Sequence, residues 1–276
     1  MSIKNTKSAL AVGSYIVIGN YAGQSIKWQV VDLQDDKAVL HAQNILTYKC
    51  FDAMHDAGQE ADQDRIHYGS NRWSSSNLRT WLNSDSQQVS YSGTAPSEAG
   101  VWQGKNAYDK EPGFLHGFTS QEKALLVPVT HEATLPGSDK LIAAGGREHH
   151  VFEDAYPDIA LRNYDLAYYE TVTDRVFLLS IKEVCQFVLQ RGFDWIRRPT
   201  PQAAERDETG GHFPWYWLRT AVGADTHGVR VVCVDGYVAG RSAYRGSIGV
   251  VPAICINAEQ VSVSGAGSEE HPYTLI

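Results

Sequence analysis

The strand pattern of this chain is clearest in residues 212–257, which read HFPWYWLRTAVGADTHGVRVVCVDGYVAGRSAYRGSIGVVPAICIN. Several runs of this stretch are rich in valine, isoleucine and aromatic residues, a composition typical of strands. An Asp-Gly pair at 235–236 separates two of these runs and favours a tight hairpin between them. We therefore predict four strands here: 215–219, 229–234, 237–239 and 249–256.

The aromatic residues at the start of this stretch have two possible roles. Trp215 and Trp217 point to one face of the predicted strand and Tyr216 to the other, because side chains alternate along a strand. They either form a sugar-stacking platform or fill the core, and a single tryptophan can bury about 150–250 Å². We favour the core. Arg219, on the tryptophan face, then either stacks on Trp217 or reaches a buried carboxylate.

Strands and short helices alternate in the rest of the chain. Residues 15–42 predict a β-meander that turns at Asp35–Asp36 and buries Trp28. Three short helices are predicted, each after a serine suited to capping. Their capping residues and apolar positions are Ser74–Ser76 with Leu78, Trp81 and Leu82; Ser120 with Leu125; and Ser180, in a capping box with Glu183, before Val184, Phe187 and Val188.

The predicted fold class is α+β, in one main domain. We expect that domain to span residues 1–258, with a loop-like segment at 52–72, an irregular segment at 84–117 and a long insertion around 136–170. Residues 259–276 are rich in glycine and serine and are expected to form a tail.

Composition excludes some functions. The 276 residues carry a net charge of -8, so the chain offers no general cationic field to hold a nucleic-acid backbone. No run approaches the roughly 20 apolar residues of a membrane span, and the first residues contain no signal-peptide-like apolar run. We expect a cytoplasmic or particle-associated protein. Four dispersed cysteines, at 50, 185, 233 and 255, are expected to be buried thiols rather than zinc ligands.

Five segments in a fixed order carry a resemblance to a known group of proteins. They are YIVIGNYAGQSIKWQVV from Tyr15, WSSSNLRTWLNS from Trp73, DRVFLLSIKEV from Asp174, WYWLRT from Trp215 and GVVPAICIN from Gly249. Together they resemble a bacterial and phage family of uncharacterised function, distantly similar to the C-type-lectin and formylglycine-generating-enzyme superfamily.

That resemblance implies a C-type-lectin-like fold, with a twisted antiparallel sheet, short helices and long irregular loops, and a ligand-presenting role. The family's usual Gly-Val-Arg-Pro ending reads Gly249-Val250-Val251-Pro252 here, so its arginine is missing. Cys233 and Cys255 lie in apolar, strand-like runs, which argues against the cysteine chemistry of the enzyme branch.

The loops beside the hairpin carry the residues that we expect to bind a ligand. Tyrosine and arginine combine a large contact area with a polar group and often dominate binding interfaces. An ordinary polar loop is the alternative. The candidate ligand-binding residues are Asp225, His227, Arg230, Tyr237, Arg241, Tyr244 and Arg245.

Other chemistry finds little support in the sequence. His149–His150 with Glu148, Glu153 and Asp154 lacks a helical metal-ligand spacing. The aspartates at 32, 35 and 36 and at 62 and 64 do not fit the calcium-loop pattern, and no nucleophile elbow or phosphate loop occurs. We expect no cofactor, no metal and no catalytic residues.

The expected function is recognition of a glycan or protein by a non-enzymatic module, as a component of a phage tail or bacterial particle that forms a homo-oligomer. An enzyme on the same scaffold and a purely structural particle subunit are the alternatives.

Overall fold

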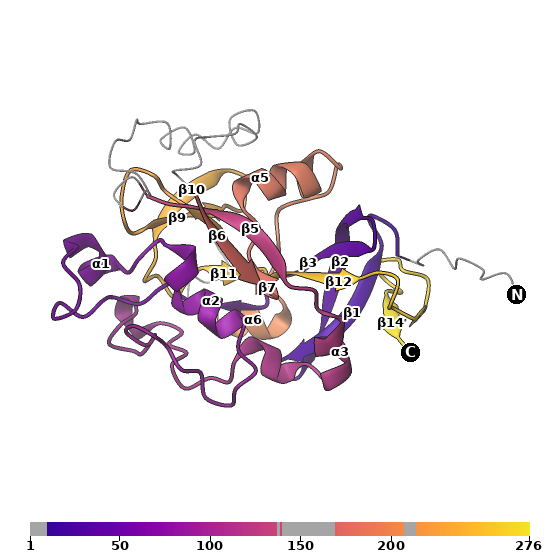
Figure 1. Cartoon of the computed structure of the whole chain (residues 1–276), viewed down its shortest axis with the longest axis horizontal. Helices are drawn as coiled ribbons and strands as arrows, with labels where there is room; N and C mark the ends of the chain where they lie inside the picture. The colour runs from indigo at the N-terminus through magenta and orange to yellow at the C-terminus, as the bar shows by residue number, and fades with distance from the viewer. Residues whose placement is uncertain (1–9, 137–138, 140–168, 207–213) are drawn as a thin grey trace, which may run out of the picture.

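Two larger sheets and one strand pair form the framework of the molecule. The computed structural model describes residues 10–136, 139, 169–206 and 214–276. Within these residues it is α+β, as predicted, with strands that are mostly short and helices of six residues or fewer. Figure 1 shows the β1–β2–β3 meander towards one end of the molecule and the β9–β10 hairpin towards the other.

The first sheet contains the predicted N-terminal meander. Its strands are β1 (Tyr15–Tyr21), β2 (Gln24–Gln34), β3 (Lys37–Ala42), β7 (Val176–Phe177), β12 (Ala253–Asn257), β13 (Val263–Ser264) and β14 (Tyr273–Leu275). They are ordered β13–β14–β1–β2–β3–β12–β7. Trp28 is fully buried, and its indole N–H donates to the Ile18 carbonyl oxygen at 2.8 Å. The predicted meander and its buried tryptophan are thus confirmed.

The second sheet contains the predicted C-terminal strands. Its members are β4 (Thr47–Tyr48), β8 (Tyr216–Ala221), β9 (Gly228–Val232), β10 (Val238–Ser242) and β11 (Gly249–Val250), in the order β10–β9–β8–β11–β4. β9 and β10 form the predicted antiparallel hairpin. Every residue of β8 is buried, including Tyr216 and Trp217, because other elements cover both faces of this strand. These two aromatic residues therefore belong to the core.

The predicted strand at 249–256 is in fact two strands. β11 and β12 are separated by Val251–Pro252 and belong to different sheets. A proline has no N–H to donate to a ladder, so it favours a strand break. The pairings between described strands are antiparallel except β1 with β14 and β8 with β11.

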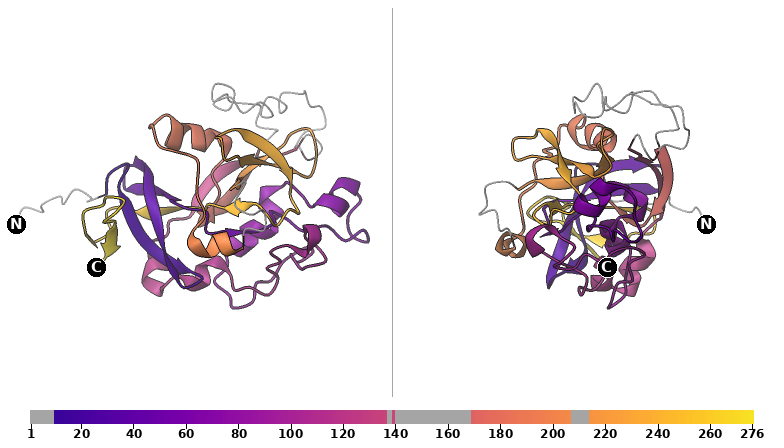
Figure 2. Two further views of the ribbon diagram at one scale, coloured as in Figure 1. Left: turned by 180° about the vertical axis from the view of Figure 1, so that it is seen from behind. Right: turned by 90° about the vertical axis from the view of Figure 1, so that its left-hand side faces the viewer.

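The C-terminal segment belongs to the first sheet rather than to a separate tail. β14 pairs in parallel with β1, with Ile16 opposite Tyr273, and β13 pairs with β14. Figure 2 shows this C-terminal segment beside the β1–β2 hairpin. Its glycines allow the turns: Gly265 and Gly267 have φ values of 114° and 72°, which L-residues rarely adopt.

The helices are short and capped. They are α1 (Gln63–Tyr68), α2 (Asn77–Leu82), α3 (Ser120–Leu125), α5 (Ile181–Glu183), which continues into a π-helical turn (Val184–Leu189), and α6 (Pro201–Glu205). Ser76 caps α2, and the Ser180–Glu183 capping box begins α5, as predicted. The cap of α3 is Thr119 rather than Ser120. α1 lies within the segment predicted to be a loop.

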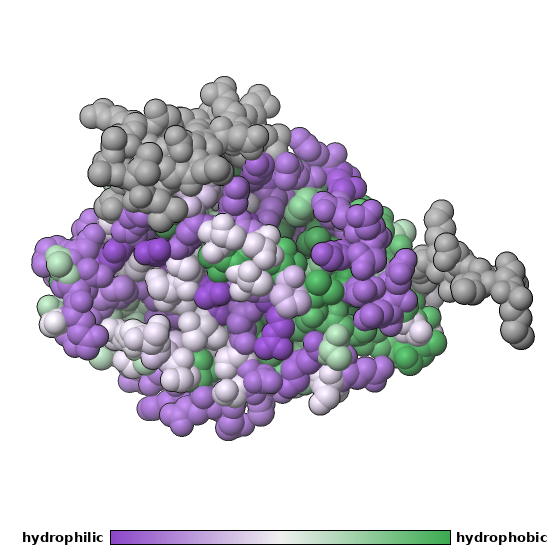
Figure 3. Space-filling view, viewed as in Figure 1, coloured by the Kyte–Doolittle hydropathy of each residue, from purple (hydrophilic) through white to green (hydrophobic). Residues whose placement is uncertain are grey.

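The remaining segments position the sites. Strands β5 (Val129–Thr134) and β6 (Tyr169–Asp174) form a separate antiparallel pair. Residues 84–117 are irregular, as expected, and contain only short 3₁₀ turns. The predicted insertion at 136–170 lies almost entirely outside the described residues. Hydrophilic residues cover most of the described surface drawn in Figure 3, and hydrophobic residues gather near the first sheet.

Candidate functional site

The structure brings most of the predicted binding residues to one region beside β9 and β10. Asp225, His227, Arg230 and Arg241 line a cavity of about 320 Å³. Tyr244 and Arg245 lie in the turn that follows β10, where Tyr244 contacts Tyr68 and Arg245 contacts Trp102. Tyr237 does not line the cavity. It lies at the β9–β10 turn with 62% of its surface exposed.

The loop that carries Asp225 and His227 is held by specific hydrogen bonds. The Asp225 carboxylate accepts from the backbone N–H of His227 at 3.0 Å and from that of Gly228. The buried Asn71 amide donates to the carbonyl oxygens of Val222, Asp225 and Gly228 at 2.9–3.2 Å. A Cβ at Gly228 would lie 2.8 Å from the Asp225 carboxylate, so a side chain here would displace that carboxylate. The loop is therefore ordered by contacts of its own.

Four segments far apart in the sequence contribute aromatic and arginine side chains next to this loop. The Tyr68 ring lies 4.9 Å from the His227 ring and 5.7 Å from the Tyr244 ring, between centroids. The Arg245 guanidinium lies 4.7 Å from the centroid of the Trp102 ring. We call these five residues, Tyr68, Trp102, His227, Tyr244 and Arg245, the aromatic–arginine surface.

Backbone hydrogen bonds fix this surface. The Tyr244 N–H donates to the Tyr68 carbonyl oxygen, and the Trp102 N–H donates to the Tyr244 carbonyl oxygen, each at 2.9 Å. Tyr68 is 39% exposed, while the other four residues are half-buried. Sequence reasoning missed Tyr68 and Trp102, because nothing in their local sequence distinguishes them from core aromatic residues. Only the chain's path places them beside residues 227–245.

Positive and negative side chains both lie in this region. The Arg241 guanidinium lies 3.9 Å from the centroid of the Trp215 ring, and the Nδ1 atom of His227 lies 3.6–3.7 Å from carboxylate oxygens of Asp64 and Asp225. Cations over aromatic faces and a carboxylate-flanked imidazole can offer stacking, hydrogen bonds and charge to a ligand. This arrangement is suited to binding.

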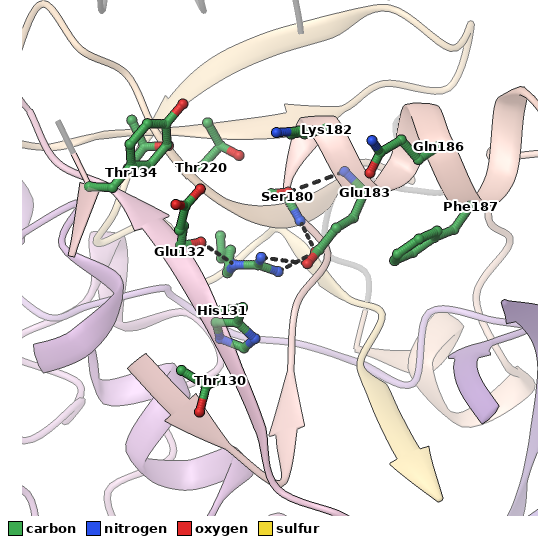
Figure 4. A pocket seen from close by; sticks show the side chains of 12 residues that line it. Thr130, His131, Glu132, Thr134, Ser180, Lys182, Glu183, Gln186, Phe187 and Thr220 are labelled. Carbon is green, nitrogen blue, oxygen red and sulfur yellow. Dashed lines mark hydrogen bonds and ion pairs between the residues drawn. The ribbon is translucent and has the colours of Figure 1, made fainter. Parts of the chain in front are cut away.

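Sequence reasoning also missed a second, more buried cavity of about 310 Å³, which is shown in Figure 4. β5, α5 and β8 form its walls. Arg219, 2% exposed, makes a two-pronged ion pair with the Glu183 carboxylate, and its Nη2–Oε1 distance is 2.6 Å. Arg219 also donates to the carbonyl oxygens of Leu178 at 2.6 Å and Glu132 at 3.2 Å. Of the two predicted options, Arg219 thus takes the buried carboxylate.

This ion pair joins four elements rather than presenting a free charge. Burial opposes ionisation of Glu183, but the charge and hydrogen bonds of Arg219 outweigh burial and lower the pKa of Glu183. The hydrogen bonds of Arg219 link β5, the residue after β7, α5 and β8, so the pair ties these segments together. Its role is structural.

His131 lies in the same cavity and is held by Asp174. Its Nε2 atom is 2.9 Å from an Asp174 oxygen, and that carboxylate also accepts from Trp73 Nε1 at 2.9 Å and Arg79 Nε at 2.6 Å. Burial lowers the pKa of His131, so the ring is neutral near pH 7. No described hydroxyl or thiol lies within hydrogen-bonding distance of its Nδ1 atom. The histidine–aspartate pair therefore has no nucleophile beside it among the described residues.

The cysteines and the candidate metal ligands do not form a site among the described residues. All four cysteines are buried and unpaired, as predicted. Burial raises the pKa of Cys185 and of Cys255 to about 11. The described part of the chain contains no group of three or more histidine, cysteine, aspartate or glutamate side chains placed to hold a metal. Asp32 pairs with Arg191 instead. The segment with Glu148, His149, His150, Glu153 and Asp154 lies outside the described residues.

Comparisons with known proteins give a family and no relative of known activity. No helix among the described residues has the length and apolar character to span a membrane. No curated protein and no solved structure matches the chain. A family model described as a domain of unknown function, DUF6273, matches residues 35–258, which is most of the sequence. The chain therefore belongs to the DUF6273 family.

Proposed function

We propose that this protein is a non-enzymatic recognition module that binds a glycan or protein ligand at the aromatic–arginine surface and the adjoining cavity. The observation that supports this most is the convergence of Tyr68, Trp102, His227 and Tyr244–Arg245 from four distant segments. Residues buried only for stability would turn their apolar faces inward, whereas Tyr68 remains 39% exposed.

The physical basis is that the surface is ordered before a ligand arrives. Ordering a flexible side chain on binding costs about 0.5–1.5 kcal/mol, and a prearranged surface avoids much of that cost. Here the Asn71 hydrogen bonds hold the 222–228 loop, and the backbone pairing of Tyr244 with Tyr68 and Trp102 holds the rest. Tyrosine and tryptophan rings combine a large apolar face with a polar group, which suits either a sugar face or a protein side chain.

We further propose that the fold is a variant of the C-type-lectin-like fold. Support comes from the mainly antiparallel sheets, the short helices and the irregular 84–117 segment. In this proposal the loops beside β9 and β10 present the ligand site, while the seven-stranded sheet forms the supporting framework.

A test of the ligand proposal uses a glycan array and cross-linking capture with the purified protein. The variants Tyr68→Ala and Arg245→Ala should reduce binding at least about tenfold, because each removes a side chain from the centre of the surface. Tyr237→Ala is the matched control, an exposed tyrosine outside this surface, and it should bind like the wild type. Loss of binding in the control, or none in the other two variants, would contradict the site.

The biological setting that we propose is a phage tail or bacterial particle, in which the protein is a homo-oligomer. Support comes from the resemblance of five sequence segments to phage and bacterial proteins. Size-exclusion chromatography with light scattering should give a defined oligomer. A monomer at all accessible concentrations would count against a particle subunit, and a gene neighbourhood without tail genes would count against a phage.

A further inference from the structure

A separate polar cavity of about 480 Å³ lies at the other end of the molecule, against the first sheet. The start of β1 and part of β2 form one wall, residues 194–198 form a second, and Glu269 from the β13–β14 connection contributes to the third. The cavity shares no residue with the aromatic–arginine surface. Residue 269 belongs to the segment that the sequence predicted to be a tail.

The floor of this cavity holds a buried arginine without a carboxylate partner among the described residues. Arg197 is 3% exposed. Its guanidinium makes two described hydrogen bonds, one to the Asp194 carbonyl oxygen at 2.7 Å and one to His41 Nδ1 at 3.1 Å. Its Nε atom is buried and has no hydrogen-bond partner in the described structure. A guanidinium has five N–H donors, so its hydrogen-bonding capacity is largely unused.

The histidine beside Arg197 does not neutralise the charge. A guanidinium can only donate, so His41 Nδ1 must be the acceptor and the imidazole must be uncharged. Burial, and then the charge of Arg197, lower the pKa of His41 well below its usual value. No carboxylate contacts the Arg197 guanidinium directly, and the more distant charges of Asp194 and Glu269 offset only part of the unfavourable removal of this cation from water.

The rim of the cavity adds further donors. Arg197, Arg198 and Lys27 line it together with two carboxylates, Asp194 and Glu269, so cations outnumber carboxylates by three to two. Lys27 and Glu269 pair with each other at 3.8 Å, and Glu269 also accepts from the Gln43 amide at 3.2 Å, which leaves Arg197 and Arg198 against Asp194 alone. The pocket therefore has a net positive charge and a buried donor group at its floor.

We propose that this cavity binds a small oxyanion, a sulfate, phosphate or carboxylate group, through Arg197, with Arg198 and Lys27 at the rim. A fixed guanidinium fork matches the geometry of these oxyanions. The anion neutralises the buried charge and takes up its unused N–H donors. This site is independent of the proposed recognition function.

Calorimetry and thermal unfolding with sodium sulfate, sodium phosphate and sodium glucuronate, each against sodium chloride at equal ionic strength, test the proposal. We expect at least one oxyanion to give a saturable calorimetric binding curve and to raise the melting temperature with the logarithm of its concentration. Saturation with glucuronate alone identifies a sugar carboxylate, whereas saturation with sulfate or phosphate identifies a free tetrahedral anion. The absence of a saturable calorimetric binding curve for every one of these anions leaves only the general salting effect on the melting temperature, and it overturns the proposal.

The variant Arg197→Met removes the charge and keeps most of the aliphatic volume. It should weaken anion binding at least tenfold, while circular dichroism shows a folded protein. Lys37→Met, an exposed cation at the start of β3, is the control and should leave binding unchanged. A folded Arg197→Met protein with wild-type affinity overturns the proposal.

If Arg197→Met does not fold, the anion affinity of the double variant Lys27→Met with Arg198→Met tests the proposal instead. Both side chains lie at the rim, so their loss spares the core and should still weaken binding severalfold. Unchanged affinity in the double variant overturns the proposal.

Discussion

At the scale of single residues, the buried Arg219–Glu183 pair makes a large demand on the fold. Removing one partner of a buried pair leaves the other charge without compensation, which typically costs about 3–5 kcal/mol. Arg219 additionally satisfies two backbone carbonyl oxygens. The energetic role of this arginine therefore exceeds that of any exposed ion pair in the molecule.

Replacement of Arg219 by alanine should lower the free energy of unfolding by about 3–5 kcal/mol, because it strands the Glu183 carboxylate in the core. Lys123→Ala, which breaks the more exposed pair with Asp85, is the control and should cost less than about 1 kcal/mol. Urea denaturation measures both. An equal loss of unfolding free energy in the two variants would show that the buried pair stabilises the fold no more than the exposed pair does.

The same pair makes stability depend on acid pH. The pKa of Glu183 in the folded protein lies below the ordinary glutamate value of 4.5, so its stabilising effect is fully present above pH 4.5. That effect is lost as pH falls through the lower, folded-state pKa. The variant Glu183→Gln cannot titrate, so its stability should fall less steeply than that of the wild type between about pH 5 and pH 3.

Denaturation midpoints across this range give the comparison. Asp174, whose pKa is also lowered in the folded protein by hydrogen bonds and charges that outweigh burial, contributes equally to both proteins. The difference between the two curves therefore isolates Glu183. Parallel curves would mean that Glu183 titrates alike in the folded and unfolded chain.

At the scale of secondary-structure elements, capping determines where the helices begin. Thr119 accepts from the Glu122 N–H at 3.2 Å, and a Glu122 carboxylate oxygen accepts from the Gly19 N–H of β1 at 2.6 Å. The α3 cap thus also ties the helix to the first sheet. Sequence reasoning placed the cap at Ser120, one residue later, because both residues have hydroxyl groups.

Thr119→Ala should lower the free energy of unfolding by about 1 kcal/mol, because it leaves an N-terminal N–H group of α3 unsatisfied. Ser120→Ala, one residue inside the helix, should change it by less than about 0.5 kcal/mol. Thermal unfolding distinguishes the two variants. The opposite order would assign the cap to Ser120.

Deletion of residues 259–276 tests whether the C-terminal segment is part of the folded unit. It removes β13 and β14, uncovers the edge of β1 and exposes apolar side chains that pack against Tyr273 and Leu275. We expect the free energy of unfolding to fall by at least about 2 kcal/mol. A denaturation midpoint equal to that of the full chain would show that the segment is an independent tail after all.

At the scale of the whole molecule, the reactivity of the four buried thiols measures whether the protein unfolds as one cooperative unit. Cys50, Cys185, Cys233 and Cys255 lie in four separate parts of the chain, and burial raises the pKa of each. A thiol reacts as the thiolate, so reaction requires both exposure and deprotonation. No single loop movement frees all four.

A colorimetric thiol reagent at pH 8 should therefore react with the folded protein at least ~100-fold more slowly than with the urea-unfolded protein, which should release four equivalents. Rapid reaction of one thiol in the folded state would locate an element that opens independently. Rapid reaction of all four would contradict the buried positions.

Local patterns in the sequence predicted much of the fold. The 15–42 meander, the β9–β10 hairpin and the caps of α2 and α5 follow from alternation, an Asp-Gly turn and serine at a helix start. These signals act over a few residues, so a single sequence contains them in full. The same is true of the buried Trp28, Tyr216 and Trp217.

The sites depended on contacts between distant segments. The loop residues from 225 to 245 were predicted from their composition, but Tyr68 and Trp102 join them only because the chain returns to this place. The cavity that we propose to bind an oxyanion includes Glu269 and Lys27. These two residues lie side by side because β14 pairs with β1. The sequence by itself determined most of the strands and helices, though not α1, β13 or β14, since short-range sterics and hydrogen bonding govern that choice. Only the tertiary structure decided which side chains meet, because long-range pairing depends on how all segments pack together.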